Sequence, residues 1–412
     1  MRIAIITAHS PLTHFGAHDG LQRPPTVLAR ALASNGHRVT LYARAEDPSL
    51  PPTAILGAGV SVEHVKSGPA RLLPDDQAAR YMPEVAAYLA GRWRTRAPDL
   101  VHAFSWTAGL AALGAVRGTD IPVVQSFESL GSLERRHAGV AVPGCRVRIE
   151  AAIGRAAAAV LARSEEEADE LARLAVPKAA VRVIPAGLDT TEFRPDDLRA
   201  KGSDKPRLVA FADDQARGLH AVIRALAQLP GAELTIVGGP DARHLPRSGP
   251  FRAAAQLAAS LRVRSRVTFA GEVADDELPA LLRSADIMVS ATAYDPTGLA
   301  AIQAMACGLP VVGSDVGGQR DAIVDGVTGL LMPPDHPAML AHRLRALLGQ
   351  PAMLQAYGIA AVDRARSRYD IERTCQETVA AYERCLRASA AIEDELAEPD
   401  EVADLREMAA LA

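Results

Sequence analysis

The sequence predicts an α/β protein with two doubly wound domains, each a mainly parallel sheet covered by helices. Short β-branched segments alternate with Ala- and Leu-rich segments of helical pattern, as βα units do around a parallel sheet. This alternation starts again after a stretch rich in Pro, Gly and charge, from Pro185 to Pro206. The chain of 412 residues is also too long for one ordinary core and fits two domains.

The expected strands define these two domains. In the first domain, at residues 1–190, we expect strands in residues 2–7, 38–43, 100–104, 121–127, 158–163 and 181–186. In the second domain, at residues 191–368, we expect them in residues 207–212, 232–239, 266–272, 286–291 and 310–315. The two domains should face a cleft lined by the carboxyl ends of both sheets, where folds of this kind bind ligands.

The end of the chain has a different pattern. Residues 369–390 are predicted to form a helix that packs back on the first domain, because one stripe is mostly apolar: Ile371, Cys375, Val379, Tyr382 and Leu386. Residues 391–412 are strongly acidic with little to bury, so we expect a disordered tail there.

Composition excludes several classes of protein. With 49% hydrophobic residues, 23% charged residues and a net charge of -4, the chain is typical of soluble globular proteins and shows no sign of a nucleic-acid partner. No secretory leader is evident, and no stretch approaches the roughly 20 apolar residues of a membrane span, so we expect a cytoplasmic protein without a transmembrane segment. The spacing of the cysteines predicts neither a zinc site nor a disulfide framework: Cys145, Cys307, Cys375 and Cys385.

One stretch, AYDPTGLAAIQAMACGLPVVGSD at residues 293–315, has the features of a binding site. Asp295 precedes an apolar helix, and Gly298 and Leu299 are expected to offer free backbone amides in its first turn, an arrangement that binds phosphate. Gln303 could face the same ligand. Aspartate followed by proline is also a common helix start, however, so this stretch alone leaves ligand binding and simple capping open.

Six segments spread over nearly the whole chain carry a more specific signal: RIAIITAHSPL, PDLVHAFSWTAGLAALGAV, IPVVQSFESLGSLERRH, RVRIEAAIGRAAAAV, VIPAGLDTTEFRP and AMACGLPVVGSDVGGQRDAIVDGVTGLLMPPD. In this order they resemble the family 4 glycosyltransferases, retaining enzymes of the GT-B fold with two Rossmann-like domains. The resemblance implies transfer of a sugar from a nucleotide diphosphate sugar, held mostly by the second domain, to a hydroxyl of a small-molecule acceptor, held mostly by the first. It implies neither a metal ion nor another cofactor, because family members neutralise the diphosphate with Arg, Lys and backbone amides.

The resemblance also suggests roles for individual residues. In the family, a glutamate that contacts the donor sugar is followed after seven residues by one that contacts the ribose hydroxyls, and Asp295 and Gln303 occupy these positions. Arg217 matches one of two cations that meet the diphosphate, and Gly20 remains from a glycine pair near the donor phosphates. Glu128 stands where relatives have a histidine near the reacting sugar, so Glu128 and Asp295 are the expected catalytic residues.

Departures from the family motif cluster on the donor side. One cation is lost, two acids follow it, and a third acid replaces the first glycine: Ala212, Asp213, Asp214 and Asp19. Gln303 lacks the charge of glutamate, and Asp295 is one methylene shorter. Arg320 could bind the donor and restore a positive charge, or it could be a solvated helix residue.

These departures keep a second hypothesis open, a catalytically degenerate homologue that acts as a partner or regulatory subunit of an active glycosyltransferase. Two further readings also stay open. Arg163 could lie near the cleft or serve only in the fold. A basic group could bind a phosphorylated acceptor or lipid surface, or form a solvated face with local salt bridges: Arg135, Arg136, His137, Arg146 and Arg148.

Overall fold

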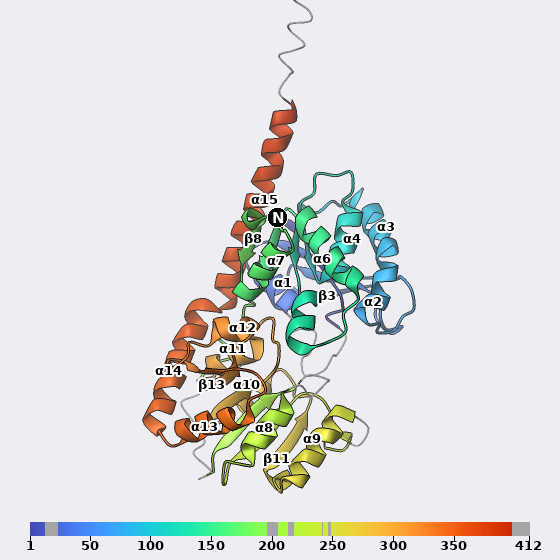
Figure 1. Cartoon of the computed structure of the whole chain (residues 1–412). Coiled ribbons are helices and arrows are strands. Elements are labelled where there is room, and N and C mark those ends of the chain that lie inside the picture. Colours follow the sequence, from blue (N-terminus) through green and yellow to red (C-terminus); the bar gives the residue numbers. More distant parts are fainter. Residues whose placement is uncertain (13–23, 196–204, 213–217, 241, 246–248, 398–412) are drawn as a thin grey trace, which may run out of the picture.

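The protein has the two α/β domains that the sequence predicts (Figure 1). The structure, a computed structural model, describes residues 1–12, 24–195, 205–212, 218–240, 242–245 and 249–397. The first domain contains an eight-stranded sheet in the order β3-β4-β2-β1-β5-β6-β7-β8, and the second contains a six-stranded sheet in the order β11-β10-β9-β12-β13-β14. Both orders reverse beside the first strand of the sheet, which is the mark of a doubly wound fold.

The strands of the first domain are β1 (Arg2–Thr7), β2 (Arg38–Arg44), β3 (Thr53–Gly57), β4 (Val60–Val65), β5 (Leu100–Phe104), β6 (Val123–Ser126), β7 (Ala159–Ala162) and β8 (Val181–Val183). Those of the second domain are β9 (Arg207–Phe211), β10 (Glu233–Val237), β11 (Val267–Gly271), β12 (Ile287–Ser290), β13 (Val311–Ser314) and β14 (Gly329–Met332). The hairpin pair β3 and β4 is antiparallel, whereas the other neighbouring strands run parallel.

The sequence did not predict β3, β4 and β14. β3 is an edge strand whose side chains are exposed or half-buried, and glycines interrupt the hairpin. β14 is only four residues long and has no β-branched residue. β3 lacks the pattern of a buried strand because an edge strand has little of its surface to bury, and β14 is too short and too poor in β-branched residues to be recognised as a strand.

The helices of the first domain are α1 (Pro24–Ser34), α2 (Asp75–Ala78), η2 (Ala79–Tyr81), α3 (Met82–Trp93), α4 (Trp106–Ala115), α5 (Gly131–Leu133), the π-helical turn η3 (Glu134–Ala138), α6 (Gly144–Ala156), α7 (Glu165–Arg173) and η4 (Lys178–Ala180). Those of the second domain are α8 (Leu219–Leu226), α9 (Gly249–Ser260), η6 (Arg264–Arg266), α10 (Leu278–Arg283), α11 (Leu299–Ala306), α12 (Gly317–Ala322), α13 (Pro337–Leu348) and α14 (Pro351–Arg368). The chain then returns through α15 (Ile371–Ala397).

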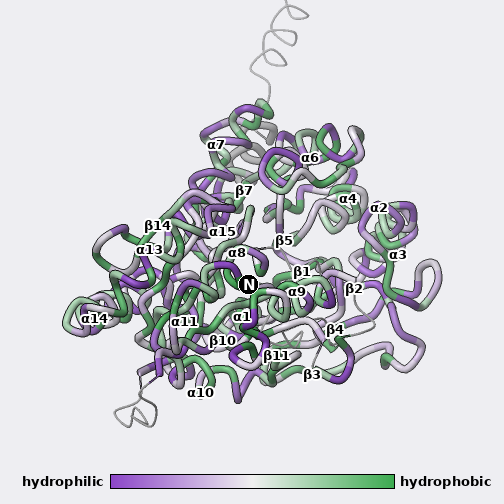
Figure 2. Tube along the Cα trace, turned by 60° about the horizontal axis from the view of Figure 1, so that its bottom comes forward, coloured by the Kyte–Doolittle hydropathy of each residue, from purple (hydrophilic) through white to green (hydrophobic). Residues whose placement is uncertain are grey.

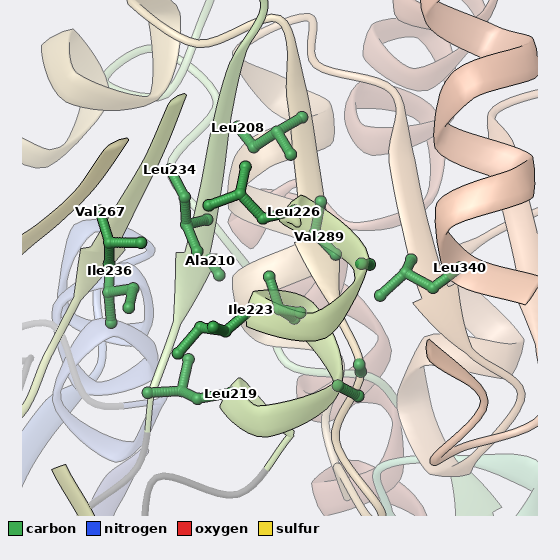
Figure 3. Close-up of a cluster of buried hydrophobic side chains, with 14 of the residues drawn as sticks. Leu208, Ala210, Leu219, Ile223, Leu226, Leu234, Ile236, Val267, Val289 and Leu340 are labelled. Atoms are coloured by element: carbon green, nitrogen blue, oxygen red, sulfur yellow. The ribbon is translucent and has the colours of Figure 1, made fainter. Parts of the chain in front are cut away.

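Each sheet is buried on both faces, because alternate side chains of a strand point to opposite sides. In the second domain, Leu219, Ile223 and Leu226 of α8 pack against side chains of the sheet (Figure 3). Leu340 of α13 and Val289 of β12 belong to the same buried cluster. Full burial of each such side chain contributes roughly 1.5–3 kcal/mol, so the core holds the strand ends in place.

The last helix packs back on the first domain, as the sequence predicts. It begins beside the connection between the domains, where the amide of Leu188 donates to the carbonyl of Tyr369 (2.8 Å). Cys375, Tyr382 and Cys385 then enter the core of the first domain, next to α1. The helix continues to Ala397, and the prediction of a disordered tail from residue 391 onward stays a prediction. Residues 398–412 lie outside the described part of the chain.

Candidate functional site

The stretch with Asp295 follows β12, which lies beside β9 where the strand order of the second sheet reverses. In doubly wound folds, ligands bind at the carboxyl ends of the strands next to such a reversal. The turn between β12 and α11 is therefore the natural place for a site in the second domain. Its side chains, however, make a different set of contacts from those expected.

The Asp295 carboxylate holds together the turn just before α11. Its Oδ1 atom accepts hydrogen bonds from the amides of Thr297 (3.1 Å) and Gly298 (2.8 Å). The amide of Leu299 donates to the hydroxyl of Thr297 (3.2 Å). The amides of Gly298 and Leu299 are thus not free, contrary to the prediction, because short side chains in the turn satisfy them. The helix starts at Leu299, later than expected.

A second turn, at the start of α12, presses against the Asp295 turn. The amide of Gly318 donates to the carbonyl oxygen of Asp295 (2.8 Å). A Cβ atom on Gly317 would lie 2.0 Å from that carbonyl oxygen, and a Cβ atom on Gly318 would lie 2.2 Å from the carbonyl carbon of Thr297. Only glycine leaves room for backbone at this distance, so the two turns form one unit.

Gln319 ties this unit to the sheet, and sequence reasoning missed it. Its Oε1 atom accepts from the amide of Ser314 (3.1 Å), and its Nε2 atom donates to Ser290 (2.6 Å) and to Oδ2 of Asp295 (3.1 Å). The side chain is buried. Both oxygens of the Asp295 carboxylate therefore have partners within the protein.

Gln303 is the opposite case. Its side chain is only 3% exposed, and its Oε1 atom has no hydrogen-bond partner among the described residues. A buried acceptor without a partner costs roughly 1–3 kcal/mol, so nearly all such groups in proteins are paired. A ligand that brings a donor to this oxygen would remove that cost.

The other predicted site residues either contact a neighbouring part of the protein, lie in an exposed loop or fall outside the described residues. Arg320 is about half exposed and donates to a carboxylate oxygen (2.6 Å) and the backbone carbonyl (2.7 Å) of Asp315, which raises the pKa of the guanidinium. Glu128 is exposed in the loop after β6. Two predicted residues, Gly20 and Arg217, lie outside the described residues, as do the departures Asp19, Asp213 and Asp214.

Arg163 and His102 both belong to the core of the first domain. Arg163 is buried, donates to the carbonyl of Ile184 (3.1 Å) and lies over the ring of Phe104. His102 is fully buried between the hydroxyls of Tyr382 (2.6 Å) and Ser126 (3.0 Å), and burial holds the pKa of its imidazole well below the usual value.

Three of the five residues of the basic group form local salt bridges. Arg136 pairs with Glu170 (2.7 Å), His137 pairs with Glu166 (2.7 Å), and Arg146 pairs with Glu134 and Glu150. These contacts favour the reading of a solvated face with internal ion pairs over that of a phosphate-binding surface.

The two domains touch beside the Asp295 turn. Tyr294 of the second domain packs against a buried cluster of the first domain and stacks on His137, with ring centroids 5.6 Å apart. Burial, with the charges of Glu167 and Glu166, raises the pKa of the Tyr294 hydroxyl. The amide of Glu165 donates to Asp321 (2.8 Å). These contacts place the acid-rich first turn of α7, a hydrophilic part of the trace in Figure 2, against the second domain.

The sequence pattern does not predict this contact between the domains. Ser164 and Glu167 have the spacing of a capping box, and Ser164 does accept a hydrogen bond from the amide of Glu167 (3.2 Å). Nothing in the pattern separates Glu166 from its acidic neighbours.

In the described residues, no group of three His, Cys, Asp or Glu side chains could hold a metal ion. No helix among them is both long and apolar enough to span a bilayer.

Comparison with known proteins matches both halves of the chain to family models. Residues 18–192 match the model "Glycosyltransferase Family 4", and residues 195–364 match "Glycosyl transferases group 1". The D-inositol 3-phosphate glycosyltransferase of Streptomyces bingchenggensis is 31% identical over 94% of this chain and 90% of its own length. The D-inositol 3-phosphate glycosyltransferase 1 of Catenulispora acidiphila is 34% identical over 88% of this chain and 91% of its own.

Solved structures share the whole architecture. Sucrose-phosphate synthase from Thermosynechococcus elongatus superposes with a TM-score of 0.85 at 27% identity, covering 94% of this chain and 99% of the other. Anabaena HepE in complex with UDP-glucose superposes with a TM-score of 0.72 at 19% identity, covering 92% of this chain and 100% of the other. The second likeness concerns the fold alone.

Proposed function

Because the chain belongs to the family 4 glycosyltransferases of the GT-B fold, we propose that it transfers a sugar with retention of configuration from a nucleotide diphosphate sugar to a hydroxyl of a small-molecule acceptor. The observation that supports a working donor site is the buried Oε1 atom of Gln303, which has no hydrogen-bond partner in the part of the chain that the structure describes. A ribose hydroxyl of the nucleotide would donate to this oxygen and remove the cost of leaving it unpaired.

In this proposal the donor side is built mostly from the second domain. Gln303 holds the ribose, the Asp295 turn lies at the sugar, and Arg217 and Arg320 are the candidate cations for the diphosphate, with Gly20 approaching from the first domain. The main catalytic effect is electrostatic stabilisation of the leaving diphosphate, which takes the acceptor proton on the face that it leaves. Glu128, after β6 of the first domain, is the proposed partner for the sugar or the acceptor hydroxyl.

For the acceptor, we propose a phosphorylated polyol. The support is that relatives which align with most of this chain are D-inositol 3-phosphate glycosyltransferases. Inositol 3-phosphate is therefore the first acceptor to assay, and unphosphorylated inositol is its matched control. Transfer to both compounds at equal rates would contradict the need for the phosphate.

Calorimetric titration with UDP, GDP and dTDP, without metal and then with magnesium, tests the donor site before any acceptor is known. We expect micromolar binding of one nucleotide that does not need magnesium. Arg217→Ala should weaken this binding and Gln303→Glu should strengthen it, since a carboxylate accepts from both ribose hydroxyls. Arg373→Ala, on α15, is the control for removing a surface charge.

A second candidate function is a degenerate homologue that acts as a partner or regulatory subunit of an active glycosyltransferase. It is favoured by the Asp295 turn, in which the carboxylate and the backbone amides satisfy one another. In this case none of the nucleotides binds at millimolar concentration, and Gln303→Glu restores nothing. The search should then turn to a protein partner.

A further inference from the structure

The first turn of α7, in the first domain, reaches the start of α12 in the second domain through one side chain. Glu166 accepts a hydrogen bond from the amide of Gly317 at its Oε2 atom (2.7 Å). Its Oε1 atom pairs with Nε2 of His137 (2.7 Å). The carboxylate is only 13% exposed, so water screens these contacts weakly.

The contact is transmitted to the Asp295 turn within two residues. Gly317 precedes Gly318, whose amide donates to the carbonyl oxygen of Asp295 (2.8 Å). A Cβ atom added to Gly317 would lie 2.0 Å from the carbonyl oxygen of Asp295, and one added to Gly318 would lie 2.2 Å from the carbonyl carbon of Thr297, so the backbones of the two turns are in direct contact. A change in the position of Gly317 must therefore move the backbone of Asp295.

His137 and Tyr294 hold the same contact from its other side. His137 binds Glu166 and also stacks on Tyr294, with an angle of 5° between the rings. Tyr294 is the residue directly before Asp295. Glu166 and the stacked pair thus fix the Asp295 turn at both ends from the first domain.

We propose that Glu166 is a positioning residue of the donor site, which sets the geometry of the Asp295 turn from the opposite domain. The role at the donor site rests on the proposed function; the coupling between the domains does not. When the domains separate, Gly317 loses its partner and the Asp295 turn loosens. Because coupling is reciprocal, a donor that orders this turn also favours contact between the domains.

Hydrogen exchange of the unliganded protein tests the coupling directly. In Glu166→Ala, we expect exchange in a peptide covering residues 314–322 to be about tenfold faster, since a charge-assisted hydrogen bond to the Gly317 amide is lost. Glu166→Gln keeps an acceptor for that amide and should restore most of the protection. Exchange in β1, β9 and α15 should not change in either variant.

Glu165→Ala is the matched control. Glu165 precedes Glu166 in the same turn and its side chain is exposed, while its contact to Asp321 uses the backbone amide and survives the substitution. Equal exchange of residues 314–322 in Glu165→Ala and Glu166→Ala would overturn the proposal.

Nucleotide binding adds a readout that a purely structural role would not move in this pattern. The Kd of the matching nucleotide sugar should rise about tenfold in Glu166→Ala, return close to wild type in Glu166→Gln, and stay unchanged in Glu165→Ala. If wild type binds no nucleotide but Glu166→Ala still speeds exchange, the proposed function fails and the coupling stands. If all variants bind the nucleotide sugar equally well, the positioning role at the donor site is refuted.

Discussion

Replacing Gln303 with methionine should stabilise the free protein and weaken nucleotide binding, a pair of opposite effects that few other roles would produce. Gln303 is buried with an unpartnered Oε1 atom. Methionine has a similar shape and no acceptor that needs a hydrogen bond, so it removes the penalty without leaving a cavity. This reasoning applies only if the oxygen is kept for a ligand.

The magnitudes follow from the unpaired acceptor. Leaving it buried costs roughly 1–3 kcal/mol, so Gln303→Met should raise the stability of the free protein by about 1 kcal/mol or more. For a domain of this size, 1 kcal/mol raises Tm by roughly 2–4 °C. One neutral hydrogen bond to a ribose hydroxyl is worth roughly 0.5–1.5 kcal/mol, so nucleotide affinity should fall by about 2- to 12-fold.

Calorimetry measures both effects on one sample, as Tm without nucleotide and as Kd by titration. Gln319→Met is the matched control, because Gln319 is equally buried but its amide binds Ser314, Ser290 and Asp295. That variant leaves these buried partners without their hydrogen bonds and should lower Tm. A fall in Tm for Gln303→Met, with unchanged nucleotide affinity, would refute a ligand role for the Gln303 oxygen.

Three further predictions concern charge and burial. Asp295→Glu should lower the free energy of unfolding by about 1 kcal/mol, because the hydrogen bonds of the Asp295 carboxylate within its turn are lost, and it should tighten binding of a nucleotide sugar more than of the free nucleotide. An unchanged Tm would contradict this role of the carboxylate. Burial raises the pKa of Glu167 from 4.5 to about 7, so the folded state holds a proton that the unfolded state has lost, and stability falls as pH rises through this range. The free energy of unfolding of Glu167→Gln, relative to that of wild type, should therefore rise by up to ~3 kcal/mol between pH 5 and pH 8, as measured by melting experiments. If this difference between the two proteins does not change with pH, the pKa of Glu167 is not raised. Tyr382→Phe leaves the Nδ1 atom of the buried His102 without its partner and should cost roughly 1–3 kcal/mol with unchanged nucleotide affinity; an unchanged Tm would show that the bond contributes nothing.

The fold could be predicted from the sequence because burial leaves a regular pattern in it. Strands such as β5 and β13 are buried on every residue and read as apolar runs between helical segments. β3 was missed because its edge position exposes residues such as Ile55, which is 84% exposed. β4 is mostly buried but carries Ser61, Glu63 and His64, so it lacks a continuous apolar run. The extension of α15 to Ala397 was missed because acidic residues of good helix propensity do not differ in pattern from a disordered tail.

The candidate site was harder to predict because its contacts join residues far apart in the chain. The motif located Asp295 and Gln303, but spacing could not show that one is paired and the other unpaired. Glu166 meets Gly317 across 151 positions of sequence, and only the packing of the two domains brings them together. Periodicity describes which face a residue occupies, whereas hydrogen-bond partners depend on the whole fold.

The side chain of Asp295 is one methylene shorter than the glutamate of the family motif, and this length decides which hydrogen bonds it can make. The side-chain oxygen of an aspartate can accept hydrogen bonds from the amides two and three residues later in the chain, as in an Asx turn. The longer glutamate side chain is poorly placed to do so. The Asp295 carboxylate binds the amides of Thr297 and Gly298 in this way, and Gln319 takes its second oxygen. Under the proposed function, a donor sugar at this turn competes with hydrogen bonds that the protein already makes, whereas the ribose meets at Gln303 an oxygen that has no partner among the described residues. Binding energy at such a site would come first from the ribose end of the donor.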